Sequence, residues 1–185
     1  MVRTTSTMLP LGTPAPPFAL PDTDGNIVAL EDFADAPALL VLFLCNHCPF
    51  VKHVAFELAA IGREYGEKGV AIVAINPNDP TAYPEDAPDR MKEEKQRAGY
   101  TFPYLFDESQ DVARAHNAVC TPDIFLFDHQ HRLFYRGQID DSRPGNGLPL
   151  TGRDLREALD AVLSGLPAPV EQRPSIGCSI KWRQE

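Results

Sequence analysis

Residues 38–49 read Ala-Leu-Leu-Val-Leu-Phe-Leu-Cys-Asn-His-Cys-Pro, and this stretch decides the fold. The continuous apolar run at 38–44 is typical of a fully buried strand. Pro49 suits the first turn of a helix, so Cys48 is expected at or near the helix N-cap. Two cysteines spaced in this way at a strand–helix junction lie within disulfide reach, close to helix N–H groups that favour a thiolate. The stretch therefore predicts thiol–disulfide chemistry by Cys45 and Cys48.

The composition is that of an ordinary globular protein. With 185 residues, 43% of them hydrophobic and 23% charged, the chain is expected to form one domain over residues 1–185. Its net charge of −9 argues against nucleic acid and anionic membrane surfaces as partners. No apolar stretch approaches the roughly 18–20 residues that span a bilayer, and residues 1–11 lack the apolar core of a secretory signal. A cytoplasmic protein is predicted, in which a spaced cysteine pair is more often catalytic or metal-binding than structural.

The order of elements predicts an α/β fold. An amphipathic helix at 49–66 leads to a second buried strand at 70–75, which gives a right-handed βαβ unit. The proline-rich residues 1–21 are expected to form an extended arm, and residues 166–185 a tail that holds Cys178 and Trp182. The other predicted elements are strands at 27–30, 103–106, 123–127 and 132–137, helices at 89–98, 110–116 and 154–163, and a loop at 77–88.

His47 lies between the two cysteines, where two interpretations are open. As a cation it would stabilise a thiolate and make the couple more oxidising; alternatively it is an exposed loop histidine without influence. A structural zinc site needs four ligands, and the sequence offers one cysteine pair with Cys120, Cys178 and scattered histidines as completions. Neither a metal ion nor another cofactor is predicted.

A second motif is Cys120-Thr121-Pro122-Asp123, directly before the strand predicted at 123–127. Proline is tolerated at a strand entrance because no ladder donor is needed there. A cis peptide at Thr121–Pro122 would present the Thr121 backbone beside the sulfurs, where an extended substrate could pair with it. Cys120 is either a buried small apolar residue or an additional redox group.

Taken together, these segments resemble the thioredoxin-fold superfamily, and more closely its peroxiredoxin-like proteins of the AhpC/TSA (redoxin) group with a Cys-Asn-His-Cys-Pro motif. The resemblance covers nearly the whole chain, and the ordered set of segments is specific. The segments are residues 12–20, 24–25, 45–49, 120–123, 135–141 and 174–182. The resemblance implies a central mixed β-sheet flanked by α-helices, with Pro122 as a cis-proline facing the cysteine pair.

The family contains two chemistries. In thioredoxin-type members the first cysteine attacks, which would make Cys45 the nucleophile and Cys48 the resolving thiol. In peroxiredoxins the peroxidatic cysteine ends a P-x-x-x-T/S-x-x-C motif and is often followed by proline, as Cys48 is followed by Pro49. Val41 and Cys45 stand where that motif has proline and Thr/Ser, so a disulfide oxidoreductase is favoured over a peroxidase.

The predicted function is therefore thiol–disulfide exchange through Cys45 and Cys48, supported by His47, Thr121 and Pro122. The alternatives are a thiol peroxidase with Cys48 or Cys45 as the peroxidatic cysteine, and a redox-sensing or metal-binding interaction module. Cys178 either relays a disulfide outward or anchors the tail by packing. The expected partners are a protein or small-molecule disulfide or thiol and an unidentified reductant; the sequence sets no oligomeric state and is compatible with a dimer.

Overall fold

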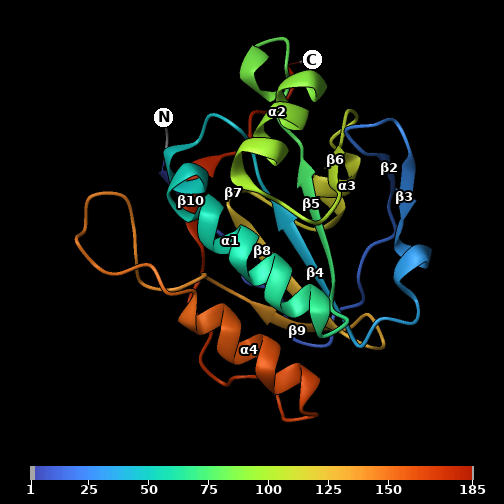
Figure 1. The fold of residues 1–185 in the computed structure, drawn as a ribbon, viewed down its shortest axis with the longest axis vertical. Coiled ribbons are helices and arrows are strands. Elements are labelled where there is room, and N and C mark those ends of the chain that lie inside the picture. The colour runs from blue at the N-terminus through green and yellow to red at the C-terminus, as the bar shows by residue number, and fades with distance from the viewer. Residues whose placement is uncertain (1–2, 185) are drawn as a thin grey trace.

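A mixed sheet of five strands forms the centre of the structure, a computed structural model that describes residues 3–184 (Figure 1). Its order is β6-β5-β4-β8-β9, with β4, β5 and β6 parallel and β8 and β9 antiparallel to their neighbours. The strands are β4 (Ala38–Phe43), β5 (Ala71–Asn76), β6 (Tyr104–Phe106), β8 (Asp123–Asp128) and β9 (Leu133–Arg136). The predicted α/β class, a central mixed sheet flanked by helices, is confirmed.

Both faces of the sheet are covered, which explains why β4 reads as a continuous apolar run. Leu40 and Leu42 point into one apolar cluster, whereas Leu39, Val41 and Phe43 point into another on the opposite face. Residues of α1 and α4 fill the first cluster; in Figure 1 α1 crosses in front of the sheet and α4 lies below it. Residues of α3 belong to the second cluster. The helices are α1 (Pro49–Glu67), α2 (Pro88–Ala98), α3 (Asp111–Ala115) and α4 (Arg153–Leu163).

The predicted arm and tail contain strands that the sequence analysis did not predict. β1 (Arg3–Thr5), β10 (Ile176–Ser179) and β7 (Cys120–Thr121) form a separate sheet in the order β1-β10-β7. These segments are short and rich in Thr, Ser and Gly, so their own patterns carry no strand signal, and only their mutual pairing makes them strands. Met1, Val2 and Glu185, the outer ends of the predicted arm and tail, lie outside the described residues.

Smaller differences concern short segments and helix ends. β2 (Ala19–Pro21) pairs with β3 (Ile27–Ala29) as a hairpin, and a short 3₁₀ helix, η1 (Leu30–Phe33), follows it. The predicted loop at 77–88 contains a second one, η2 (Pro84–Asp86). Cys48 is the N-cap of α1, as predicted. Within residues 3–184 no helix has the length and apolar character needed to cross a membrane.

Candidate active site

Three cysteine sulfurs meet at the N-terminus of α1. Cys45 follows the end of β4, Cys48 caps α1, and Cys178 lies in β10, so strand, helix and tail each contribute one. The sulfurs of Cys48 and Cys178 lie 2.7 Å apart, and the Cys45 sulfur is 3.1 Å from the Thr121 hydroxyl. All three side chains are buried. The structure thus joins the predicted pair to a third cysteine that is 130 residues away in the sequence.

Cys48 has the environment of a thiolate. The pKa of Cys48 is lowered from 9.0 to about 5, chiefly because the Cys45 thiol donates a hydrogen bond to its sulfur. Burial opposes this shift, while the Cys178 thiol and the Val51 backbone N–H lower the pKa further. No side-chain hydrogen bond formally caps α1, yet the helix N-terminus still favours negative charge at this position. Cys48 is therefore the most acidic of the three thiols.

Cys45 and Cys178 have the opposite character. Burial raises the pKa of Cys45 well above its usual value, and hydrogen bonding to Cys48 and the charge of Asp86 add to the rise. Burial also raises the pKa of Cys178, to about 12, together with its hydrogen bond to Cys48. A thiol that stays protonated can donate a hydrogen bond to a thiolate, so one sulfur is charged because its two neighbours are not.

Asp86, which the sequence analysis missed, organises the turn between the two cysteines. Its fully buried carboxylate accepts hydrogen bonds from the Asn46 N–H (2.6 Å), from the Asn78 side chain (2.8 Å) and from His47 Nδ1 (2.6 Å). Burial raises the pKa of Asp86, but these hydrogen bonds outweigh it and the net shift is downward. The residue lies in η2, inside the predicted proline-rich loop, where no sequence signal distinguished it from a solvated acid.

His47 contacts Asp86 through Nδ1 and has a ring nitrogen within 4.8 Å of the Cys45 sulfur. Its ring stacks on Tyr83 with 4.9 Å between centroids, and its side chain is only 10% exposed. Nε2 is buried and has no hydrogen-bond partner among the described residues. His47 is therefore not an exposed residue, and its influence on the thiolate stays a prediction, with Asp86 beside it to offset a positive charge.

One set of described residues could hold a metal ion. A sulfur of Cys45, a ring nitrogen of His47 and a carboxylate oxygen of Asp86 all lie within 4.8 Å of one another. Three protein ligands leave an open position, the pattern of catalytic rather than structural zinc. Both Asp86 oxygens, however, already accept hydrogen bonds from protein donors, which a metal ion would have to displace.

The Thr121–Pro122 peptide bond is cis and lies beside the sulfurs. The Thr121 carbonyl oxygen is 3.2 Å from the Cys48 sulfur and accepts a hydrogen bond from its thiol form. Thr121 thus contacts both predicted catalytic cysteines, one through its backbone and one through its hydroxyl. The sulfur of Cys120 points elsewhere, to the Pro122 carbonyl at 3.6 Å, and burial raises its pKa strongly. The surroundings of Cys120 are those of a packing residue.

A small hollow with about 20 Å³ of solvent space lies beside Pro122, between the first turns of α1 and the start of β10. Most of its wall is apolar, and its polar groups are few. The residues that line it include Phe50, His53, Pro122, Ile139, Ser175 and Ile176.

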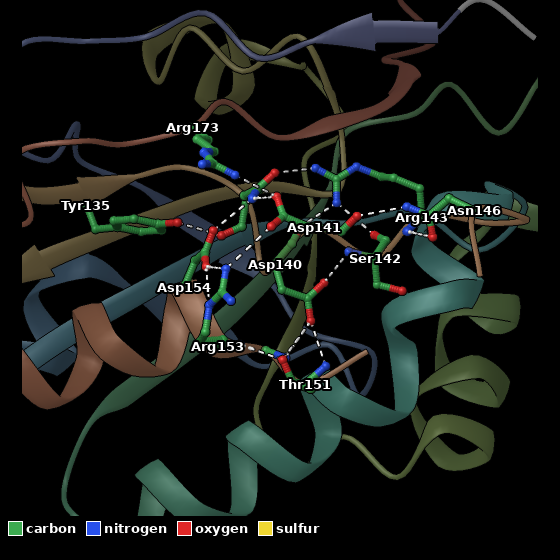
Figure 2. Close-up of polar contacts among 12 residues, drawn as sticks. Tyr135, Asp140, Asp141, Ser142, Arg143, Asn146, Thr151, Arg153, Asp154 and Arg173 are labelled. Carbon is green, nitrogen blue, oxygen red and sulfur yellow. Dashed lines mark hydrogen bonds and ion pairs between the residues drawn. The ribbon is translucent and has the colours of Figure 1, made fainter. Parts of the chain in front are cut away.

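The loop after β9 holds its own polar residues in structural contacts, as Figure 2 shows. The Asp140 carboxylate accepts backbone N–H groups of Ser142, Thr151 and Gly152 and so closes the loop at 140–152 onto the start of α4. Asp141 pairs with Arg153 and Arg173. These acids therefore hold the loop at one side of the hollow in place.

Comparison with known proteins places the chain in a family. The model of the AhpC/TSA family matches residues 11–136. A thiol-disulfide oxidoreductase ResA from Geobacillus kaustophilus is 30% identical over 161 residues, which cover 86% of this chain and 82% of that protein. The crystal structure of an uncharacterized conserved protein from the same organism has a TM-score of 0.97 at 55% identity, covering 100% of this chain and 98% of that chain.

The fold is thioredoxin-like. The thioredoxin domain of a thiol-disulfide oxidoreductase from Bacteroides vulgatus superposes with a TM-score of 0.66, at 21% identity, over 84% of this chain and 99% of that chain. At that identity the similarity concerns the fold alone. Together with the family match, it confirms the family and the fold that the motifs indicated.

Proposed function

The chain belongs to the AhpC/TSA family and is an oxidoreductase of thioredoxin-like fold, and we propose that it catalyses thiol–disulfide exchange with Cys48 as the attacking sulfur. The observation that carries this proposal is the position of Cys48, which caps α1 with the Cys178 sulfur 2.7 Å away. Hydrogen bonds from the two neighbouring thiols lower its pKa to about 5. A thiolate is the nucleophile in disulfide exchange, and Cys48 is the thiol that is ionised at neutral pH. Cys45, which the thioredoxin resemblance implied as the nucleophile, is held protonated instead.

The reaction needs two protein sulfurs. The Cys48 thiolate attacks one sulfur of a substrate disulfide, a Cys48–substrate bond forms, and the other substrate sulfur leaves as a thiol after taking a proton. Cys178 or Cys45 then attacks the Cys48 sulfur, which releases the second substrate thiol and leaves a protein disulfide. Cys178, 2.7 Å away, is the resolving thiol in this proposal, and Cys45 is a hydrogen-bond donor to the thiolate. An external dithiol returns the protein to its reduced form.

Turnover of a small disulfide with dithiothreitol as reductant tests the proposal. Cys48→Ser should lose at least about a thousandfold in rate, because the nucleophile itself is removed. Cys120→Ser is the matched control and should stay within about twofold, since a buried thiol of high pKa contributes packing only. A Cys48→Ser variant with the wild-type rate would refute the assignment. Redox titration with mass mapping of each disulfide then shows whether Cys178 or Cys45 pairs with Cys48.

A thiol peroxidase is the second candidate function, and the surroundings of Cys48 support it. A thiolate at a helix N-terminus followed by Pro49 fits the peroxidatic position, whereas Val41 and Cys45 replace the proline and Thr/Ser of that motif. The rate constant for hydrogen peroxide separates the two candidates. A value no higher than that of free cysteine excludes peroxidase function, and a much higher value makes the peroxide the physiological oxidant.

A metal-binding module is supported only by the cluster of Cys45, His47 and Asp86. Native mass spectrometry of the reduced protein with added zinc tests it, with Asp86→Asn as the variant that should lose any bound ion. A cytoplasmic setting, an unidentified cellular reductant and a single functional domain over the whole chain remain part of the proposal.

A further inference from the structure

The strand edge that faces the sulfurs is already occupied by the chain itself. β10 pairs antiparallel with β7, with Cys178 opposite Thr121 and Ser179 opposite Cys120. An extended peptide that added to this edge would use the same backbone groups of β7. β1 pairs with the other side of β10, so β10 is the central strand of its sheet and not a loosely held edge. The tail thus takes the place that the sequence analysis expected for an extended substrate.

Gly177 makes this close approach possible. A Cβ at residue 177 would lie 2.0 Å from the Thr121 carbonyl oxygen and 2.5 Å from its carbon. Both atoms belong to the backbone, which cannot move away as the end of a side chain could. The backbone of β10 therefore lies directly on the Thr121–Pro122 peptide, where a residue with a side chain does not fit.

Both ends of β10 are anchored. Before the strand, the Ser175 hydroxyl donates to the Gly137 carbonyl at 2.7 Å. After it, the Lys181 N–H donates to the Asn78 side chain at 2.8 Å. Further along, the Arg114 guanidinium lies over the Trp182 ring, 4.4 Å from the centroid of that ring. An incoming peptide would have to break these contacts as well as two strand pairings before it reached Thr121.

We infer that β10 excludes extended polypeptides from the Thr121 edge, so that the oxidised substrate is a low-molecular-weight disulfide. This inference rests on the proposed function and names its substrate class. The mixed disulfide formed on Cys48 is resolved by Cys178 without displacement of the tail, since their sulfurs lie 2.7 Å apart.

The test compares two substrates, hydroxyethyl disulfide and insulin, in dithiothreitol-coupled turnover by the full chain. The wild type should accelerate reduction of the small disulfide and leave insulin near the uncatalysed rate. Gly177→Ala should release the tail and raise the ratio of the insulin rate to the small-disulfide rate at least about tenfold. The small-disulfide rate itself should fall, because the released tail carries the resolving Cys178 away from Cys48. Gly66→Ala is the matched control, because a Cβ there meets no atom within 4 Å. Trp182, the only tryptophan, reports release of the tail by its fluorescence.

Three results would overturn the inference. The first is a wild type that reduces insulin as efficiently as the small disulfide. The second is a Gly177→Ala variant with a displaced Trp182 and an unchanged ratio of the two rates, and the third is one whose Trp182 spectrum stays native. If Gly177→Ala does not fold, hydrogen exchange of the β10 amides in the wild type replaces it: deprotection on adding oxidised insulin contradicts the inference, and retained protection without reaction supports it. Failure of the proposed function is distinguished separately, by small-disulfide turnover that survives in Cys48→Ser.

Discussion

The first turn of α1 and the strand β10 each present a buried cysteine to the other, and the two sulfurs differ in acidity despite lying 2.7 Å apart. The pKa of Cys48 is about 5, whereas that of Cys178 is about 12. Burial raises both values, so burial does not explain the difference. Cys48 receives hydrogen bonds from two thiols at a helix N-terminus, while Cys178, on a strand without such a dipole, supplies one. The arrangement of donors, rather than depth, selects the nucleophile.

The largest effect on this contrast is expected from Cys45→Ala, because Cys45 is the main cause of the low pKa of Cys48. Its removal should raise that pKa furthest toward the ordinary value of 9.0. Ultraviolet absorbance of the thiolate during a pH titration measures the change without requiring substrate access. An unchanged midpoint near 5 would show that Cys45 is not the main cause of the low pKa of Cys48.

The low pKa of Cys48 also predicts how the stability of the folded protein depends on pH. The folded-state pKa of Cys48 lies below its unfolded value of 9.0, so the thiolate's contribution to stability is fully present above pH 9.0 and is lost as the pH falls through about 5. Denaturant midpoints across this range should fall toward acid in the wild type, and less so in Cys45→Ala. Equal slopes in the two proteins would contradict the assigned cause.

A smaller effect is expected from Cys178→Ala, which removes the second of the two thiol donors. The pKa of Cys48 should rise, but by less than in Cys45→Ala. Cys178→Ser is the control, because a hydroxyl still donates a hydrogen bond at this position. A rise larger than that caused by Cys45→Ala would reverse the order of the two donors and make β10 the main source of the thiolate.

Asp86→Asn should change the pKa of Cys45 and leave that of Cys178 in β10 unchanged. The negative charge of Asp86 is one of the causes that raise the pKa of Cys45, so its removal should lower that pKa while Cys178 keeps its own. The chemical shift of a labelled cysteine β-carbon follows each thiol separately. Asp141→Asn, on the exposed side of the loop after β9, is the matched control. A Cys45 pKa that does not move would show that burial alone sets it.

The smallest effect is expected from Lys181→Met. The positive charge of Lys181 lowers the pKa of Cys178 slightly against burial, so its removal should raise that pKa by a small amount. Lys52→Met on α1 provides a comparison, since Lys52 is not among the causes of the Cys178 shift. A fall in the Cys178 pKa would mean that Lys181 acts through packing of the tail and not through its charge.

The sequence predicts the structure closely around the cysteine pair and poorly in the short strands and in the loop that holds Asp86. The elements around Cys45 and Cys48 were predicted closely: α1 begins at Pro49 and the buried strand at Ala38, because consecutive apolar residues, a proline and the helical period carry that information locally. Asp86 was missed because an acid in a proline-rich loop is ordinarily solvated, and only the packing of η2 under Asn46 and Asn78 buries it. β1, β7 and β10 were missed because each is short and lacks an alternating pattern.

By itself the sequence determined the class of fold and placed two cysteines at a strand–helix junction, since both follow from residues adjacent in the chain. The tertiary structure decided which sulfur is acidic, because the hydrogen-bond donors to Cys48 include a thiol from a segment 130 residues away. It also decided what lies on the Thr121 edge, because pairing of β10 with β7 depends on backbone groups that every residue carries and that leave no mark in the sequence, apart from the glycine at 177.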